Sequence, residues 1–154
     1  MYPLLGARRP GGAKRQASVG AQWFYWIAGL SVLNSLLASA HAGIQFIFGL
    51  GITRLIDELR AAWLPDWSYL NVALSVAVAG VFVLIGWIAG KGYRAAYLVG
   101  LALYILDALI FIIFPRQIMW LPLLVHAYLS YRIVQGFLAT RALQAAASPA
   151  PPTA

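Results

Sequence analysis

The longest stretch without a charged side chain constrains the fold of this chain more than any other feature. No Asp, Glu, Lys or Arg occurs in the 38 residues between Arg15 and Arg54, and only Asp66 interrupts the stretch from Arg60 to Lys91. Apolar residues make up 62% of the chain and charged residues 10%, whereas soluble domains have about 45–50% and about a quarter. A soluble fold of 154 residues could not bury so much apolar surface, so the sequence predicts an integral membrane protein.

Four apolar runs predict membrane-spanning helices. They cover residues 23–40, 72–89, 95–114 and 118–139. At about 1.5 Å per residue, each run approaches the roughly 30 Å thickness of the hydrocarbon core. The expected fold class is therefore all-α, an integral membrane four-helix bundle. Ala38-Ser39-Ala40 also fits a signal-peptidase site, so cleavage before His41 is the alternative to a permanent first span.

The segment 44–63 is expected to lie at the membrane surface, outside the bundle. Residues 44–52 are too few and too rich in glycine to span, so they form either a re-entrant or an interfacial segment. From Ile52 onward, apolar residues recur with helical spacing. The charged residues fill the other face: Arg54, Asp57, Glu58 and Arg60. This pattern predicts one exterior amphipathic interfacial helix, whose charges form surface pairs or dock a partner.

The distribution of basic residues predicts the orientation. Residues 1–20 are expected to be a disordered basic cytoplasmic tail, 21–141 the transmembrane domain, and 142–154 a disordered Pro/Ala tail. With four spans and both termini in the cytoplasm, eight Lys and Arg lie inside and three outside. A fifth span through the glycine-rich segment would give seven against four, so four helices is the better assignment.

Three polar side chains are predicted to meet inside the bundle. Counted from the outer helix ends, Asn34, Asp107 and His126 lie at roughly 9–13 Å depth, and Tyr104 shares the face of Asp107. An ionisable group inside a membrane is costly, which makes a proton or cation relay one hypothesis. The alternative is an interhelical polar clasp that only holds the bundle together.

The sequence gives little indication of a redox, metal, haem or catalytic site. The chain has no cysteine, which excludes disulfides, thiol nucleophiles and iron–sulfur clusters. His41 and His126 are the only histidines, but their depths differ too much for one haem, and they lack the local spacing of a zinc site. No catalytic constellation is present, so we expect no enzyme activity, no metal and no cofactor.

Small residues are spaced for close helix packing. Gly86 and Gly90 form a GxxxG pair, and Ala96 with Gly100 forms a second small pair. These positions are expected to permit close helix approach, within one chain or in a dimer.

Four segments resemble a family of small bacterial inner-membrane proteins without an assigned activity. They are AGLSVLNS (Ala28 to Ser35), FIFGLGITRLID (Phe46 to Asp57), LYILDALIF (Leu103 to Phe111) and LLVHAYLSYRIVQG (Leu123 to Gly136). The resemblance covers about residues 23–140. It implies four helices and a membrane location, and it offers no activity to carry over.

The sequence therefore predicts a non-enzymatic structural or accessory subunit of a larger complex in the bacterial inner membrane. The alternative is a small proton- or cation-coupled transporter or channel acting as an oligomer. The expected partners are the lipid bilayer and either a heteromeric membrane complex or a homo-oligomer. The net charge of +7 is attributed to topology, so no nucleic acid is expected.

Overall fold

The structure is a computed structural model that describes residues 10–39, 68–113 and 120–148, and each of the four elements in these ranges is an α-helix. The helices are α1 (Pro10–Ser39), α3 (Ser68–Gly90), α4 (Arg94–Ile113) and α5 (Trp120–Ala147). The predicted all-α fold with four helices is confirmed for the described residues. The predicted interfacial segment 44–63, which holds Arg54, Asp57, Glu58 and Arg60, lies outside them.

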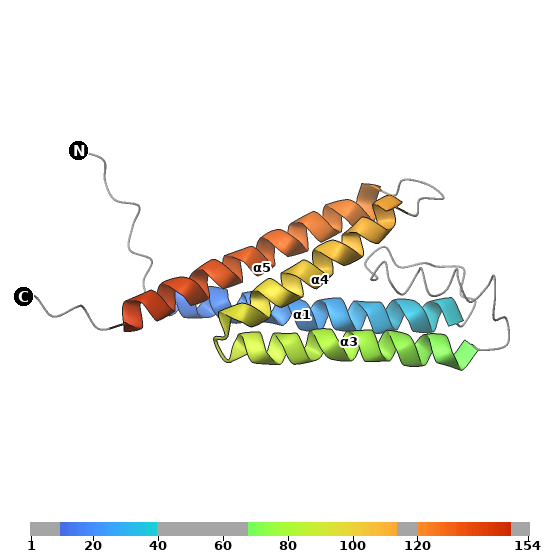
Figure 1. Cartoon of the computed structure of the whole chain (residues 1–154), viewed down its shortest axis with the longest axis horizontal. Coiled ribbons are helices and arrows are strands. Elements are labelled where there is room, and N and C mark those ends of the chain that lie inside the picture. The colour runs from blue at the N-terminus through green and yellow to red at the C-terminus, as the bar shows by residue number, and fades with distance from the viewer. Residues whose placement is uncertain (1–9, 40–67, 114–119, 149–154) are drawn as a thin grey trace, which may run out of the picture.

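The helices form a bundle in which α1, α3, α4 and α5 alternate in direction (Figure 1). α1 packs mainly against α3 and α5, and α4 packs against the same two helices from the other side. The start of α1, the turn between α3 and α4, and the end of α5 therefore share one end of the bundle (Figure 1). We call it the basic end, because five basic residues lie near it: Lys14, Arg15, Lys91, Arg94 and Arg141.

Two of the described helices are long and apolar enough to cross a membrane, over Val72–Gly90 and Arg94–Ile113. Only 33% and 28% of their apolar windows are buried in the bundle, whereas the core helix of a soluble protein would be mostly buried. The other two predicted spans, 23–40 and 118–139, overlap α1 over residues 23–39 and α5 over residues 120–139. Those helices mix apolar residues with Trp, Tyr, Gln and Asn, which lowers their mean hydropathy.

The first helix begins well before the predicted span. α1 starts at Pro10, so the prediction of a disordered tail over 1–20 is wrong for residues 10–20. Proline suits the first helical position, because its fixed φ is already helical and its missing N–H would have no partner there. Packing then holds the segment: Ala13 is buried, and the Tyr97 hydroxyl on α4 donates a 2.7 Å hydrogen bond to the Ala17 carbonyl.

The last helix also runs further than predicted. α5 continues to Ala147, so the disordered tail over 142–154 is wrong for its first six residues. Alanine favours the helix, and Gln144 Nε2 donates a 2.8 Å hydrogen bond to the carbonyl of Gly92 in the α3–α4 turn. Gly92 has a φ of +91°, which glycine adopts easily and which ends α3 sharply.

Phe24 of α1 lies at the centre of the apolar core and is fully buried. Its ring lies where a Cβ on Gly100 of α4 would be, and a Cβ on Gly86 of α3 would lie 3.1 Å from the Phe24 Cβ. Gly100 thus leaves room for the Phe24 ring, and Gly86 allows α3 to lie close to the Phe24 Cβ. The third, Gly90, has only an ordinary contact, 4.0 Å from its Cβ position to the Ala21 Cβ.

Among the described glycines, the two whose added Cβ would come nearest to the backbone of another helix are Gly20 of α1 and Gly136 of α5, which the sequence analysis did not single out. A Cβ on Gly20 would lie 2.5 Å from the Gly136 Cα, and a Cβ on Gly136 would lie 2.7 Å from the Gly20 Cα. Neither position has room for any side chain without moving a backbone. This crossing fixes how α1 and α5 are aligned along their length.

Candidate functional site

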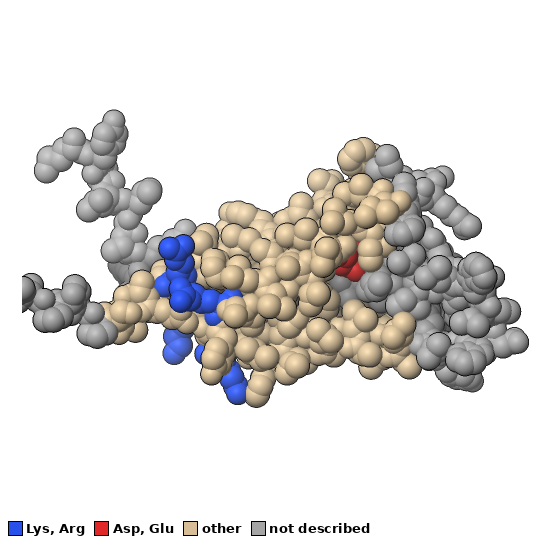
Figure 2. Space-filling model, in the orientation of Figure 1, with Lys and Arg blue, Asp and Glu red and all other residues tan. Residues whose placement is uncertain are grey.

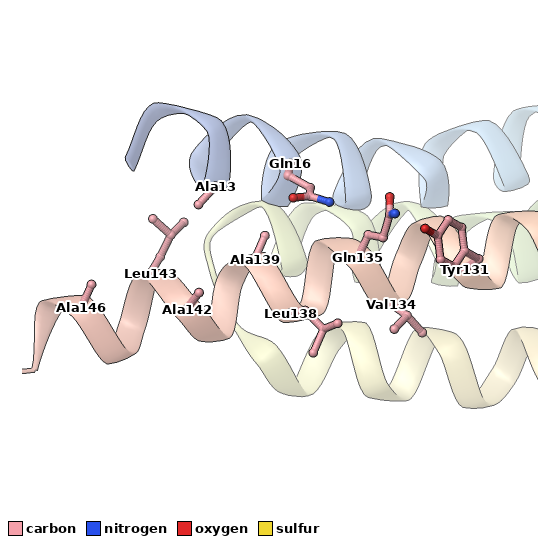
Figure 3. A pocket seen from close by; sticks show the side chains of 10 residues that line it. All are labelled: Ala13, Gln16, Tyr131, Val134, Gln135, Leu138, Ala139, Ala142, Leu143 and Ala146. Carbon is pink, nitrogen blue, oxygen red and sulfur yellow. The ribbon is translucent and has the colours of Figure 1, made fainter. Parts of the chain in front are cut away.

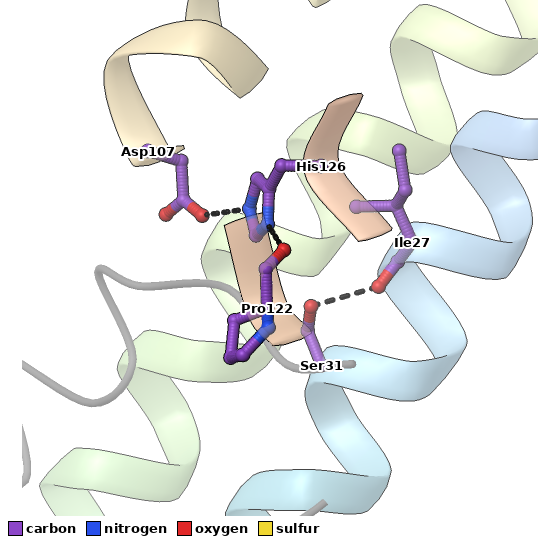
Figure 4. A network of polar contacts seen from close by, with 5 residues as sticks. All are labelled: Ile27, Ser31, Asp107, Pro122 and His126. Carbon is purple, nitrogen blue, oxygen red and sulfur yellow. Dashed lines mark hydrogen bonds and ion pairs between the residues drawn. The ribbon is translucent and has the colours of Figure 1, made fainter. Parts of the chain in front are cut away.

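The centre of the candidate site is a buried pair formed by Asp107 of α4 and His126 of α5 (Figure 4). His126 Nε2 lies 3.0 Å from Asp107 Oδ2, and both side chains are about 95% buried. The other ring nitrogen, His126 Nδ1, lies 2.8 Å from the Pro122 carbonyl one turn earlier in α5. Both ring nitrogens are therefore held inside the bundle.

The hydrogen-bond partners limit where the protons of the pair can lie. The Pro122 carbonyl can only accept, so His126 Nδ1 must carry a hydrogen and donate it. A proton must also lie between Nε2 and the carboxylate oxygen, because two bare lone pairs would repel at 3.0 Å. The pair is then either an aspartate with an imidazolium or a carboxylic acid with a neutral imidazole. Both arrangements have zero net charge, which is the condition for burying such groups.

Aromatic rings enclose the imidazole on two sides. The Tyr104 ring stacks on it with centroids 4.4 Å apart and planes 13° apart, and Phe111 meets it edge-on at 5.3 Å. Phe82 of α3 in turn packs edge-on against Tyr104 at 6.3 Å. Residues of α3, α4 and α5 therefore fix the ring orientation that the hydrogen bonds need.

The structure brings together three of the four residues of the predicted polar cluster. Asp107, His126 and Tyr104 meet as expected, but Asn34 does not join them. Asn34 is half-buried, and its Oδ1 has no hydrogen-bond partner among the described residues. No hydrogen bond joins Asn34 to the pair among the described residues. On the buried face of α1, the Ser31 hydroxyl donates a 2.7 Å hydrogen bond to the Ile27 carbonyl of its own helix (Figure 4).

Sequence reasoning missed two members of the site. Pro122 lies four residues before His126, and Phe111 lies four residues after Asp107 and seven after Tyr104. Each spacing puts the two residues on one helix face. Helical spacing could have predicted Phe111. The hydrogen bond to the Pro122 carbonyl depends on how the His126 ring is rotated, which no sequence pattern reveals.

A shallow hollow on the outside of α3 and α4 reaches Asp107. It measures about 320 Å³ and is lined by apolar side chains of both helices together with Asp107. Val78 and Val81 come from α3, and Leu103 and Leu106 from α4. Asp107 therefore borders this apolar hollow directly.

Metal and haem binding receive no support from the described residues. Within them, no group of three or more His, Cys, Asp or Glu side chains is placed to hold a metal ion. His41, the second histidine of the haem hypothesis, lies outside the described residues.

The charged residues are separated along the bundle. Lys14 and Arg15 lie near the start of α1, Lys91 and Arg94 at the α3–α4 turn, and Arg141 near the end of α5. Arg132, the sixth described basic residue, lies nearer the middle of α5. Figure 2 shows the visible basic side chains gathered towards the basic end, with the acidic group in the other half.

Comparison of the chain with protein-family models, with curated proteins and with solved structures gives no match. The resemblance to small bacterial inner-membrane proteins therefore stays a prediction.

Proposed function

We propose that the chain is a multi-pass protein of the bacterial inner membrane, with all four described helices crossing the bilayer. The distribution of side chains supports this proposal. Large apolar residues are exposed on every helix, among them Leu106, Ile113 and Leu124, which are 59–65% exposed. Polar groups such as Ser31, Asp107 and Thr140 are buried. Lipid favours this arrangement, because apolar side chains then face acyl chains and polar side chains lie between the helices, away from lipid.

The concentration of Lys and Arg at the basic end supports a cytoplasmic location for this end of the bundle. Lys and Arg concentrate on the cytoplasmic side of membrane proteins. Five of the six described basic residues come from α1 near its start, the α3–α4 turn and α5 near its end, and the alternating helix directions bring these segments together. Both termini are therefore proposed to lie in the cytoplasm.

Thiol labelling tests this topology directly, because the chain has no cysteine of its own. A single Ala145→Cys variant marks the basic end and a single Trp120→Cys variant marks the opposite end; both positions are exposed. With a membrane-impermeant maleimide, we expect Trp120→Cys to react in intact spheroplasts and Ala145→Cys to react only after lysis. The reverse pattern contradicts the orientation, and full labelling of both in a soluble fraction contradicts the membrane location.

Within the membrane, we infer a non-enzymatic role as a structural or accessory subunit. The closed geometry of the Asp107–His126 pair carries this inference: both imidazole nitrogens are used in contacts within the bundle, and Tyr104 covers one ring face. Such a pair fastens α4 to α5. The exposed apolar faces of α3 and α4 are then available to lipid or to another subunit.

Native mass spectrometry of the protein, extracted from its own membrane in mild detergent, tests the role. We expect a stoichiometric second subunit. A bare homo-oligomer contradicts the accessory role and favours the second candidate, a proton- or cation-coupled transporter. The hollow at Asp107 and the shared proton favour that candidate. It requires a flux into liposomes that Asp107→Asn abolishes while the protein stays folded; flux equal to that of empty vesicles contradicts it.

A further inference from the structure

The start of α1 and the end of α5 extend past the other two helices at the basic end. The candidate spans of α3 and α4 both end at the turn between these helices, and Figure 1 shows α1 and α5 reaching beyond this turn. We call residues 10–20 of α1 and 137–147 of α5, which begin at the crossing of Gly20 with Gly136, the paired helix ends. In the topology proposed above, the hydrocarbon core ends where the spans end. The part of the paired helix ends beyond the turn then lies in the cytoplasm.

An apolar groove follows the paired helix ends (Figure 3). It measures about 600 Å³. α1 lines it with Ala13 and Gln16, and α5 lines it with apolar side chains that include Leu138, Ala142 and Leu143. Leu138 is 51% exposed. An apolar groove that continues outside the hydrocarbon core is typical of a surface that another molecule covers.

Basic side chains adjoin the groove. Lys14 and Arg15 lie between its two lining residues on α1, Arg141 precedes Ala142 on α5, and all three basic side chains are exposed. Neither of the paired helix ends contains an Asp or Glu. The one carboxylate in the described parts of the chain, Asp107, belongs to the buried pair. A molecule that covers the groove is therefore favoured if it brings negative charge.

This charge disfavours a second copy of the chain as the occupant. A second copy that presented the same surface would bring its own Lys14, Arg15 and Arg141 to the same place, and like charges across an interface repel. The position beyond the turn disfavours acyl chains, which would have to leave the hydrocarbon core to follow the groove. An acidic protein surface satisfies both conditions.

We propose that this groove binds an amphipathic helix of a partner protein, with the apolar face of that helix in the groove and its flanking Asp or Glu side chains facing Lys14, Arg15 and Arg141. Helices bind apolar grooves in this way through anchors three and four residues apart. The lining residues of α5 run from 131 to 146, which is roughly 22 Å of helix and matches about four turns of a partner. The proposal rests on the accessory role and the cytoplasmic location proposed above, and it identifies where the second subunit would dock.

A designed peptide tests the groove. The probe is a fluorescent helix of about 16 residues with Leu and Ala on one face and Glu on the other. One control peptide has Lys in place of every Glu, and a second has the probe's composition in an order that removes the apolar face. Fluorescence anisotropy measures their binding to the purified full-length protein, in detergent and in phosphatidylcholine nanodiscs, with empty micelles and nanodiscs as background. We expect the probe to bind at least about tenfold more tightly than either control in both settings.

Two neighbouring alanines provide matched variants. Ala142 and Ala145 are both exposed on α5, but only Ala142 lines the groove. Ala142→Glu places a carboxylate against the apolar face of the acidic probe and should weaken its binding about tenfold or more. Ala145→Glu makes the same change of charge on the same helix and should change the affinity less than about twofold.

Two further variants separate the apolar contact from the charge. Leu138→Ala removes an exposed apolar side chain from the groove and should weaken probe binding about fivefold or more. Lys14→Gln with Arg15→Gln should weaken it by a similar factor and reduce its dependence on salt. Circular dichroism checks that each variant keeps its helix content.

Several results overturn this docking surface. They are no probe binding above background, equal binding of the Glu and Lys peptides, and equal losses in Ala142→Glu and Ala145→Glu. Binding that occurs in detergent but not in nanodiscs would assign the groove to lipid. A dimer of the protein alone that Ala142→Glu dissociates would assign it to a second copy.

The failure of this inference can be told apart from that of the proposed function. If thiol labelling places Ala145→Cys outside the cytoplasm, the location fails, and with it the docking of a cytoplasmic partner. If labelling and native mass spectrometry give the expected results while the probe does not bind, only this docking surface is lost.

Discussion

Replacing Gly20 or Gly136 by alanine is expected to lower the free energy of unfolding by about 1–3 kcal/mol, the usual cost of overpacking a close contact. The added Cβ would meet the facing backbone at 2.5–2.7 Å. A flexible side chain could rotate away, but a helix backbone cannot, so α1 and α5 would have to separate. Chemical unfolding in detergent, followed by helical circular dichroism, measures the loss.

Two other glycines provide matched controls. Gly29 on α1 and Gly80 on α3 are exposed, and a Cβ at either position would meet nothing within 4 Å. Gly29→Ala and Gly80→Ala should stabilise the protein by up to about 1 kcal/mol, because alanine is the better helix former. The two pairs of variants should therefore shift stability in opposite directions. Equal shifts at Gly20 and Gly29 would contradict the close crossing of α1 and α5.

Removing either member of the buried pair is expected to cost about 1–3 kcal/mol, because the remaining group keeps its desolvation cost and loses the hydrogen bond between the two side chains. Asp107→Leu leaves His126 Nε2 without its acid, and His126→Leu leaves the carboxyl without its ring nitrogen. The double variant should cost less than the sum of the two single variants, by about 0.6–2 kcal/mol, the range for interhelical hydrogen bonds in membranes. The same detergent unfolding assay gives all three values.

The Asp107→Asn variant removes the carboxylate but keeps a side chain that can hydrogen-bond to His126, so it distinguishes the effect of the hydrogen bond from that of the charge. An asparagine amide can donate to the unprotonated Nε2 of an imidazole whose Nδ1 hydrogen stays on the Pro122 carbonyl. This variant should therefore stay much closer to wild-type stability than Asp107→Leu. Strictly additive single costs, or an Asn variant as unstable as the Leu variant, would show that the pair does not fasten α4 to α5.

The positions of the helices could be predicted from the sequence, but their ends could not. The apolar runs at 72–89 and 95–114 correspond closely to α3 and α4, because the Gly90–Arg94 turn separates them with glycine and charge. The predicted start of α1 and the predicted end of α5 were wrong, because long-range contacts determine where these two helices begin and end at the basic end. Ala17 is helical partly through Tyr97, and Gln144 through Gly92, and no local pattern contains these partners.

The polar pair was predictable because depth and helix face agreed for both residues. Asp107 and His126 lie on antiparallel neighbours, and counting inward from the outer ends of the two predicted spans, at residues 114 and 117, puts them at similar depths. Asn34 was misplaced because nothing in the sequence fixes α1 along its axis or about it. The crossing of Gly20 and Gly136 does so, and the buried stripe of α1 then follows Phe24, Ile27, Ser31 and Ser35, with Asn34 at its edge.

The crossing of α1 with α5 also has a consequence for the order of assembly. Ribosomes deliver helices in sequence, so α1 can meet α3 early, while its glycine face has no partner until the last of the described helices emerges. α5 then supplies both Gly136 for Gly20 and His126 for Asp107. A nascent chain that stops before α5 would lack both contacts. The bundle is therefore completed late, when this one helix supplies the glycine crossing and the polar pair together.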